Sequence, residues 1–349
     1  MPVRALLIVN PRATSTAAHD PDVIAGSLAA RVDLQTVYTR YRGHAGDLAA
    51  ALAGRPQDGG PEVLLTYGGD GTVNEVVNGL MRGALAPGAC EAQGTQRAPG
   101  AQGIRDAGLA TKARGPSVPA AGKLPAVAPI PGGNANVFAR SLGLPADPLA
   151  AVEAILACLS AGRTRTIGLG MAQDRYFTFS AGLGLDAEVV RAVEELRASG
   201  RRASPSLFFW ATLRQYFGVT DRRHPALTLE RDGRPPIAGL FMGIVSNTTP
   251  WTYLGSRPIS PTPNADFNSG LDVFALRELR TLSTLNAVRQ MMRRGGGPPS
   301  GRCVVSLHDE AELTLRSRRP IAFQVDGEYV GEPESVTFRF VPQALRVAA

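Results

Sequence analysis

Three short apolar runs in the first half of the chain, each followed by a turn and a helical pattern, set the strongest constraint on the fold. The runs are Ala5–Val9, Val63–Tyr67 and Ala126–Ile130. Their nearly continuous apolar character is typical of strands that are buried on both faces of a parallel sheet. The repeated order of strand and helix therefore predicts a doubly wound α/β domain.

The segments around these runs carry helix signals. Asp20 and Pro21 supply an N-cap and a first-turn proline for a helix with Ile24 and Leu28 on its inner face. A second helix stops at Gly54. Apolar residues at helical spacing then give the clearest helical face of the chain, formed by Val73, Val76, Val77, Leu80 and Met81. We also expect a strand at 34–39 and helices from 136 and over 149–159.

The α/β pattern stops between about residues 84 and 125, where Gly, Ala, Pro and Gln dominate. Such a composition cannot build a core, and a structureless stretch of this length is uncommon inside a domain. We therefore predict a disordered insertion within a first domain that spans residues 1–163. Its scattered Arg and Lys residues leave two interpretations open, a neutral spacer and a basic membrane tether.

Beyond Arg163 the chain changes to short alternating segments separated by Gly and Pro. This pattern favours an antiparallel sandwich or barrel, which we place at residues 164–330. Residues 331–349 form a C-terminal segment that could return to the first domain. Helical stretches near 204–217 and 282–294 interrupt the pattern. The first is apolar nearly all round, which leaves burial and lipid contact open, and the second ends in arginines that complement the helix dipole.

The net charge of the chain and the spacing of its cysteines indicate its cellular compartment and the kinds of partner that it binds. Lys and Arg outnumber Asp and Glu by 37 to 30, which biases the chain towards anionic partners. Cys90, Cys158 and Cys303 are too far apart for a metal motif and odd in number for a disulfide framework, so we expect a reducing cytoplasm. The longest apolar run, Ala238–Val245, is far below the roughly 20 residues that a membrane-spanning helix needs. Any membrane contact is then peripheral. The basic residues lack interleaved aromatics, so no nucleic-acid partner is expected.

Two glycine-rich turns carry the first functional signal. Gly68–Thr72 and Pro131–Asn136 each follow a predicted strand and open a helix. Glycine lets a backbone approach a ligand closely, and a helix N-terminus favours phosphate. Two such turns at the carboxyl ends of parallel strands can meet at one crevice. Asp70 sharpens this interpretation, because a carboxylate beside phosphate is repulsive unless Mg²⁺ lies between them.

Five segments in this order resemble the diacylglycerol kinase catalytic-domain family, which includes bacterial soluble lipid kinases and sphingosine kinases. They are Asn10-Pro11, Gly68–Val76, Pro131–Arg140, Ala181–Asp186 and Val325–Glu328. The resemblance covers nearly the whole chain except the insertion. It implies the NAD kinase/diacylglycerol kinase-like fold, with an α/β ATP-binding domain and a β-sandwich lipid-binding domain. It also implies ATP and Mg²⁺ as cofactors, and a lipid hydroxyl at the membrane surface as the phosphate acceptor.

The resemblance also implies the site residues. Those expected around ATP are Asn10, Pro11, Thr39, Gly68, Gly69, Asp70, Gly71, Thr72, Asn74, Gly133 and Asn134. Glu328 is expected to be the catalytic base, reaching across the cleft between the domains. Asp70 and Asp326 are expected to be catalytic carboxylates that bind the metal or orient the reacting groups. Without the other motifs, Asp326-Gly327-Glu328 would be interpreted as an ordinary hairpin turn.

Two departures from the family pattern concern ligands. Asn134 stands where many relatives have Thr or Ser, although an amide can still hydrogen-bond to phosphate. Ser269 stands where some relatives have an Asp that binds a structural Mg²⁺; this removes a charged ligand and leaves open whether a second metal binds.

Two other functions remain as alternatives. An NAD-kinase-like enzyme would share the Gly68–Gly71 turn, but Phe138-Ala139-Arg140 and the aromatic helix favour a lipid. A non-catalytic lipid- or nucleotide-binding module is opposed by the retained Asp70, Asp326 and Glu328. The acceptor, diacylglycerol or a similar long-chain lipid, is not fixed by the residues, and association into a homodimer is left open.

Overall fold

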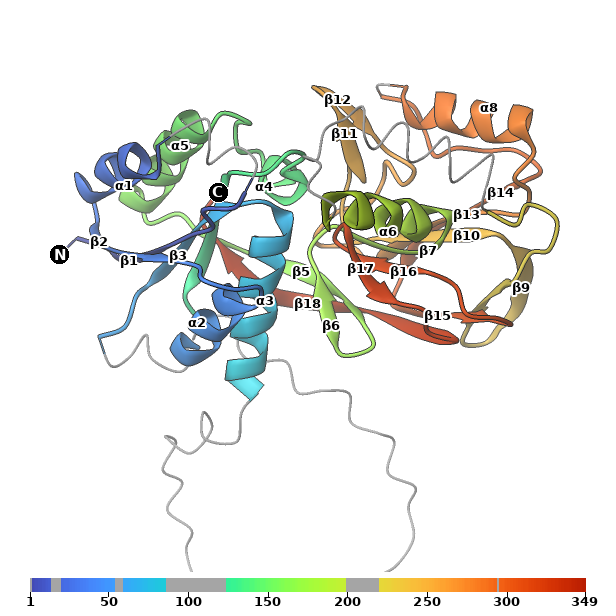
Figure 1. The fold of residues 1–349 in the computed structure, drawn as a ribbon, viewed down its shortest axis with the longest axis horizontal. Coiled ribbons are helices and arrows are strands. Elements are labelled where there is room, and N and C mark those ends of the chain that lie inside the picture. The colour runs from blue at the N-terminus through green and yellow to red at the C-terminus, as the bar shows by residue number, and fades with distance from the viewer. Residues whose placement is uncertain (1, 14–19, 54–58, 86–123, 199–219, 294) are drawn as a thin grey trace, which may run out of the picture.

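One sheet of ten strands runs through both halves of the molecule and joins them (Figure 1). The structure, a computed structural model, describes residues 2–13, 20–53, 59–85, 124–198, 220–293 and 295–349. Residues 86–123 of the insertion predicted over about 84–125, and the aromatic helix predicted over 204–217, lie outside the described residues. Residues 84 and 85 belong to a helix that ends at Leu85, and Leu124 is buried, so the insertion is shorter than predicted at both ends.

The first half contains the predicted parallel strands. They are β1 (Arg4–Val9), β2 (Asp33–Tyr38), β3 (Val63–Gly68) and β4 (Ala126–Pro131). Their order in the sheet is β2-β1-β3-β4, and each neighbouring pair is parallel. All residues of β3 and β4 are buried. This confirms the α/β fold that the apolar runs predict.

Helices cover both faces of this parallel sheet (Figure 1). One face is covered by α1 (Pro21–Ala29) and α5 (Pro148–Ser160), and the other by α2 (His44–Leu52) and α3 (Asp70–Leu85). The short α4 (Val137–Ser141) follows β4. Asp20 caps α1 as predicted, because its side chain accepts a hydrogen bond from the Asp22 amide.

Helix α3 lies unusually close to α2, and glycine makes this contact fit. A Cβ atom added to Gly79 would lie 2.1 Å from the carbonyl oxygen of Gly46. Since α3 begins at the first glycine turn, this packing fixes the direction in which that turn points.

The second half is a sandwich of antiparallel strands. One sheet has the order β14-β13-β10-β7-β16-β17, formed by Val304–Glu310, Leu271–Leu276, Met242–Ser246, Ser180–Gly184, Phe323–Val325 and Glu328–Gly331. The other is the antiparallel part of the ten-stranded sheet, with β18 (Ser335–Val347), β15 (Glu312–Ser317), β8 (Leu227–Arg231) and β9 (Arg234–Leu240). Leu229, Leu315 and Phe338 of this part pack against Leu183 and Val273 of the first sheet.

Smaller elements complete this half. The strands β5 (Arg165–Ala172) and β6 (Arg175–Phe177) extend from β18, and β11 (Thr252–Leu254) pairs with β12 (Arg257–Ile259). Two helices, α6 (Leu185–Ala198) and α8 (Thr281–Met291), lie on the sandwich. No helix among the described residues is long and apolar enough to cross a bilayer.

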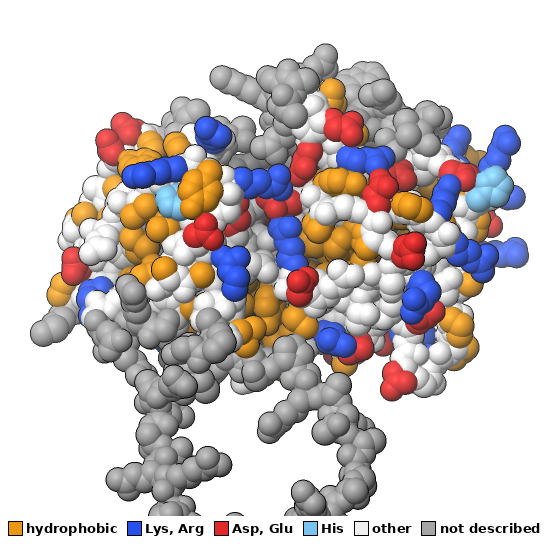
Figure 2. Space-filling view, turned by 60° about the horizontal axis from the view of Figure 1, so that its bottom comes forward, with side chains coloured by type: hydrophobic (Ala, Val, Ile, Leu, Met, Phe, Trp, Pro, Cys, Tyr) orange, Lys and Arg blue, Asp and Glu red, His pale blue; other side chains and the backbone are white. Residues whose placement is uncertain are grey.

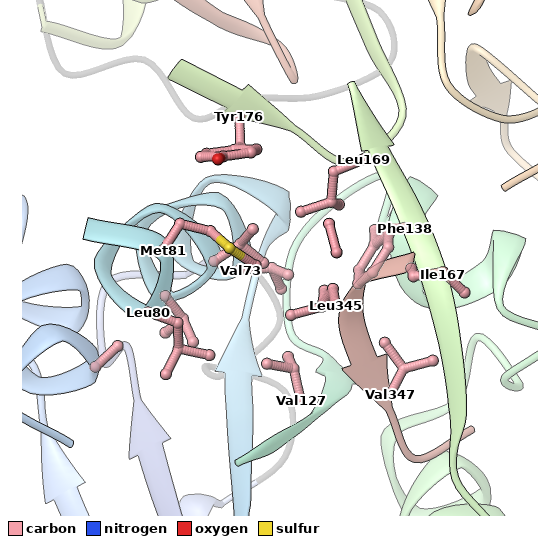
Figure 3. Packing of buried hydrophobic residues seen from close by; sticks show 14 of the residues in the cluster. Val73, Leu80, Met81, Val127, Phe138, Ile167, Leu169, Tyr176, Leu345 and Val347 are labelled. Carbon is pink, nitrogen blue, oxygen red and sulfur yellow. The ribbon is translucent and has the colours of Figure 1, made fainter. Parts of the chain in front are cut away.

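Strand β18 connects the two halves. Its residues from Phe338 onwards pair antiparallel with β5, and Val347 pairs parallel with Val127 of β4. Figure 3 shows Leu345 and Val347 packed beside Val127 and Ile167 in the core cluster that also contains Phe138. The C-terminal strand is therefore part of the sheet that positions the glycine turns.

The structure departs from the expected strands at one functional point. The strand expected over 176–180 is divided, because β6 ends at Phe177 and β7 begins at Ser180. At the break, the amides of Thr178 and Phe179 leave the ladder and donate to the carboxylate of Asp326. The helix α6 was not expected from the sequence. A strand at β18 was not named either, although residues 331–349 were expected as a segment that could return to the first domain, and β18 pairs with β4 there.

Candidate active site

The predicted nucleotide residues gather at the carboxyl edge of the parallel strands. The Asn10 amide donates to Tyr67 O at 2.9 Å, and the Thr39 amide donates to Val9 O at 2.8 Å. The Asn10 side chain donates from Nδ2 to Oγ1 of Thr72 at 2.9 Å, which ties the end of β1 to the start of α3. In open α/β sheets this edge is where ligands bind.

The two glycine turns lie directly against each other. The Gly132 amide donates to Gly68 O at 2.8 Å. A Cβ atom on Gly132 would lie 2.8 Å from Gly68 N, and one on Gly133 would lie 2.6 Å from the Cα of Gly69. These glycines are therefore required by the contact between the turns, in addition to any ligand that approaches them.

Asn136 shapes the second turn, a role that the sequence analysis missed. Its Oδ1 accepts from the Gly133 amide at 2.8 Å, and its Nδ2 donates to Gly133 O at 2.9 Å. Its φ of 49° lies in the left-handed region that Asn tolerates better than most residues. Asn134, the residue expected near ATP, is exposed. The sequence signal that could have identified Asn136 is its place directly before the first residue of a helix, a position where Asn is favoured.

Asp70 connects the first turn to α4. Its two carboxylate oxygens accept one hydrogen bond each, from the amides of Val137 and Phe138, both at 3.0 Å. Burial raises the pKa of Asp70 to about 6, and these two hydrogen bonds oppose the rise. Each oxygen keeps a lone pair, so Asp70 fits as a ligand of a Mg²⁺ ion that is otherwise held by phosphate and water.

Asp326 is bound on all sides and does not fit as a metal ligand. Its Oδ2 accepts from Thr178 N, Thr178 Oγ1 and Asn74 Nδ2, at 2.7, 2.8 and 2.8 Å. Its Oδ1 accepts from Phe179 N and Ser180 N at 3.0 and 3.1 Å. Five donors occupy a carboxylate that has about four lone-pair sites. Its exposed fraction is 3%, and burial raises its pKa. The expected metal role of Asp326 is therefore not supported by this geometry.

Asn74 is expected near ATP, but its side chain joins the two halves instead. Besides Asp326, its Nδ2 donates to Tyr176 O at 3.0 Å, and its Oδ1 accepts from Nη2 of Arg175 at 2.8 Å. Asn74 is 1% exposed. Its hydrogen-bonding capacity is thus used between α3 and the β6–β7 region.

Glu328 reaches from the sandwich to the first glycine turn. A Cβ atom on Gly71 would lie 2.6 Å from Oε1 of Glu328. The preceding pair, Asp326 and Gly327, has φ values of 47° and 77°, and Val325 pairs with Glu328 across it. The residues therefore form the hairpin turn that the sequence also allowed, and this hairpin carries Glu328 to the glycine turn.

Two arginines hold Glu328, and neither was singled out from the sequence. Nη2 of Arg175 lies 2.7 Å from Oε2 of Glu328, and Nη2 of Arg42 lies 3.6 Å from the same atom. Basic and acidic side chains lie side by side near the middle of the face in Figure 2. No local pattern marks Arg175, because its two partners come from α3 and β17, far away in the chain.

Glu75 belongs to the same motif, Gly68–Val76, as Asp70 and Asn74, and its side chain contacts the neighbouring helix α2. Its Oε1 accepts from the amide of Gly43 at 2.8 Å, at the start of α2. Burial raises the pKa of Glu75. Part of the motif therefore fixes neighbouring helices.

The region of Ser269, where the question of a second metal arose, is held by hydrogen bonds within the protein. Ser269 Oγ donates to Asp266 O at 3.1 Å, and the Gly270 amide donates to Oδ1 of Asp309 at 2.6 Å. Within the described ranges, no three His, Cys, Asp or Glu side chains are grouped as metal ligands.

The two halves and the edge between them define the NAD kinase/diacylglycerol kinase-like fold. Residues 4–172 match the family model of the diacylglycerol kinase catalytic domain. The resemblance expected from the motifs is thereby confirmed, and the match indicates a kinase.

Solved structures agree with this fold. A diacylglycerol kinase from Bacillus anthracis is 18% identical, with a TM-score of 0.64, over 99% of this chain and 96% of that chain. A candidate diacylglycerol kinase from the same organism is 19% identical, with a TM-score of 0.67 and the same coverage. At these identities the likeness establishes the fold alone. No curated protein sequence matches the chain.

Proposed function

We propose that the protein is an ATP-dependent lipid kinase that phosphorylates the hydroxyl of diacylglycerol or a similar long-chain lipid. The observation that carries the proposal is the contact between Glu328 of the sandwich and Gly71 of the glycine turn. The Glu328 carboxylate of the second half lies beside a glycine-rich turn of the first half that is suited to bind phosphate. Phosphoryl transfer needs a group that orients the nucleophile next to the bound phosphates.

The first half would bind the nucleotide. The turn at Gly68–Thr72 opens α3, where the helix dipole favours phosphate, and the turn at Gly132–Asn136 packs directly against it. Mg²⁺, held by Asp70 together with phosphate and water, would neutralise charge on the phosphates.

Glu328 would orient and deprotonate the acceptor. Its carboxylate accepts the proton of the lipid hydroxyl while the hydroxyl oxygen bonds to the γ-phosphorus. The bond from that phosphorus to the bridging oxygen breaks, and ADP leaves with the electron pair. The ion pair with Arg175 fixes the carboxylate in direction, which matters because positioning dominates this reaction.

The test is an assay of the purified protein with γ-labelled ATP and Mg²⁺ against a panel of acceptors. The panel contains diacylglycerol, ceramide, sphingosine and NAD. The expected result is transfer to a lipid, lowered by about 10² or more in the Glu328→Gln variant. Transfer to NAD alone would replace the proposal by an NAD kinase, and no transfer to any acceptor would leave the non-catalytic module.

The expected location is the cytoplasm, with peripheral contact to the membrane that holds the lipid.

A further inference from the structure

Helix α8 carries an apolar stripe that faces away from the protein. Leu282, Leu285 and Val288 are 83%, 59% and 40% exposed. Their spacing of three residues places them on one side of the helix. Ala287 and Met291 are buried instead and pack into the cluster below. In Figure 1 the helix lies at the outer edge of the C-terminal half.

The helix therefore carries an outward apolar stripe in addition to the inner face that packs on the protein. Single exposed apolar residues are common, but three neighbours on one face of one helix form a patch that water solvates poorly. Exposed apolar patches of this kind mark sites of contact with a protein partner or a membrane.

The charge around the stripe has one sign. Residues 279–308 contain five arginines and no Asp or Glu. Of these arginines, Arg280, Arg289, Arg293 and Arg302 are described and exposed. An acidic residue from outside this range, Glu278, lies 3.6 Å from Arg280. The surroundings of the stripe are therefore strongly basic.

Two hollows flank the start of α8 and are lined by arginines. One, of about 550 Å³, is lined by Arg222, Arg223 and Arg280, together with Asp221 and three uncharged residues. The other, of about 420 Å³, is lined by Arg280 and Arg302, with Glu278 and several small polar residues. Both could receive an anionic group beside the apolar stripe.

We propose that α8 is a membrane-docking helix for bilayers that contain anionic lipid. Leu282, Leu285 and Val288 enter the boundary between headgroups and acyl chains, while the arginines contact lipid phosphates. The purpose of the contact rests on the proposed function, since a lipid acceptor lies in the bilayer. A second copy of the chain fits less well, because a two-fold contact through this face would bring arginines onto arginines.

The experiment measures vesicle binding without ATP, so that its outcome is independent of turnover. Wild-type protein is sedimented with vesicles of phosphatidylcholine alone and of phosphatidylcholine mixed with phosphatidylglycerol. We expect binding to the mixed vesicles that weakens with added salt. The double variant Leu282→Ser/Leu285→Ser should bind at least about tenfold more weakly, since two leucines no longer leave water. Arg280→Ala should lose about fivefold.

Val23→Ser is the matched control, because Val23 is 52% exposed on α1, far from α8 in the chain. It should bind as the wild type does, and all variants should keep the wild-type melting temperature. Unchanged binding by both the double variant and Arg280→Ala would overturn the proposal, as would a wild type that ignores anionic vesicles. A dimer that only the double variant disrupts would assign the stripe to a second copy instead.

Discussion

Asn74 and Asp326 lie 252 positions apart and are joined by a buried hydrogen bond of 2.8 Å between Nδ2 and Oδ2. Asn74 belongs to the helix that opens at the first glycine turn, and Asp326 to the hairpin that presents Glu328. This bond therefore sets the position of the candidate base relative to the turn.

Replacing Asn74 by Leu should destabilise the protein. The change removes donors to Asp326 and Tyr176 and leaves the Arg175 guanidinium without its amide acceptor. We expect a loss of about 2–4 kcal/mol in the free energy of unfolding, since buried polar groups lose their partners. Urea unfolding measures it. Asn134→Ala, at an exposed position, should stay within about 0.5 kcal/mol of the wild type.

Glu328→Gln should lower the turnover number by about 10² or more. The amide keeps the shape of the side chain but cannot accept the hydroxyl proton. ATP affinity, measured by calorimetry, should change little, because Gly71 and the backbone amides remain. A normal turnover in this variant together with a loss in Asp326→Asn would move the base to Asp326.

Asp70→Ala should affect both activity and folding. Phosphoryl transfer should be abolished, and the amides of Val137 and Phe138 should lose their acceptor at the start of α4. We expect a destabilisation of about 1–3 kcal/mol, measured by thermal unfolding. Unchanged stability would show that water replaces the carboxylate at this helix.

Gly79→Ala should destabilise the contact between α2 and α3. The added methyl group would meet the Gly46 carbonyl oxygen at 2.1 Å, so the helices must separate. Overpacking of this kind costs about 1–3 kcal/mol or more. Gly26→Ala in α1 is the matched control, because nothing lies within 4 Å of its Cβ position. It should stabilise the protein by about 0.5–1 kcal/mol.

Asp186→Asn should change how stability depends on pH. Burial raises the pKa of Asp186 from 3.8 to about 6, while the hydrogen bond from Gln324 opposes the rise. The folded state thus holds this proton more tightly than the unfolded state. The cost of ionising the buried group is absent below about pH 4 and complete above about pH 6, so wild-type stability falls as pH rises through this range.

The asparagine does not ionise and should escape that cost. The variant should gain up to about 3 kcal/mol over the wild type near pH 8, and this advantage should vanish near pH 4. Unfolding curves at both pH values measure the difference. An equal stability difference at both pH values would show that the pKa of Asp186 is the same in the folded and the unfolded state.

The parallel sheet could be predicted because its signals are local. The runs at Ala5–Val9 and Val63–Tyr67 are apolar and each ends at a turn residue, and the Asp20-Pro21 cap starts a helix where the structure has one. The glycine turns were predictable for the same reason.

The contacts that assemble the site could not be predicted in this way. Asn74, Arg175 and Asp326 meet only because α3, β6 and β16 come together in space. The break between Phe177 and Ser180 was missed because its cause is a carboxylate from another segment. In α8, the helical spacing of Leu282 and Leu285 was visible, but the spacing does not tell which side faces the core.

The return of β18 to the first half has a consequence for synthesis of the chain. Val347 pairs with Val127, so the sheet that bears the glycine turns lacks a strand until residue 347 has left the ribosome. Domains usually fold in the order in which they are made. Here the first-made half should stay incomplete until β18 has been made, and the site between the halves should close only then. Ribosome-stalled chains that end before β18 should therefore remain sensitive to protease in the α/β half.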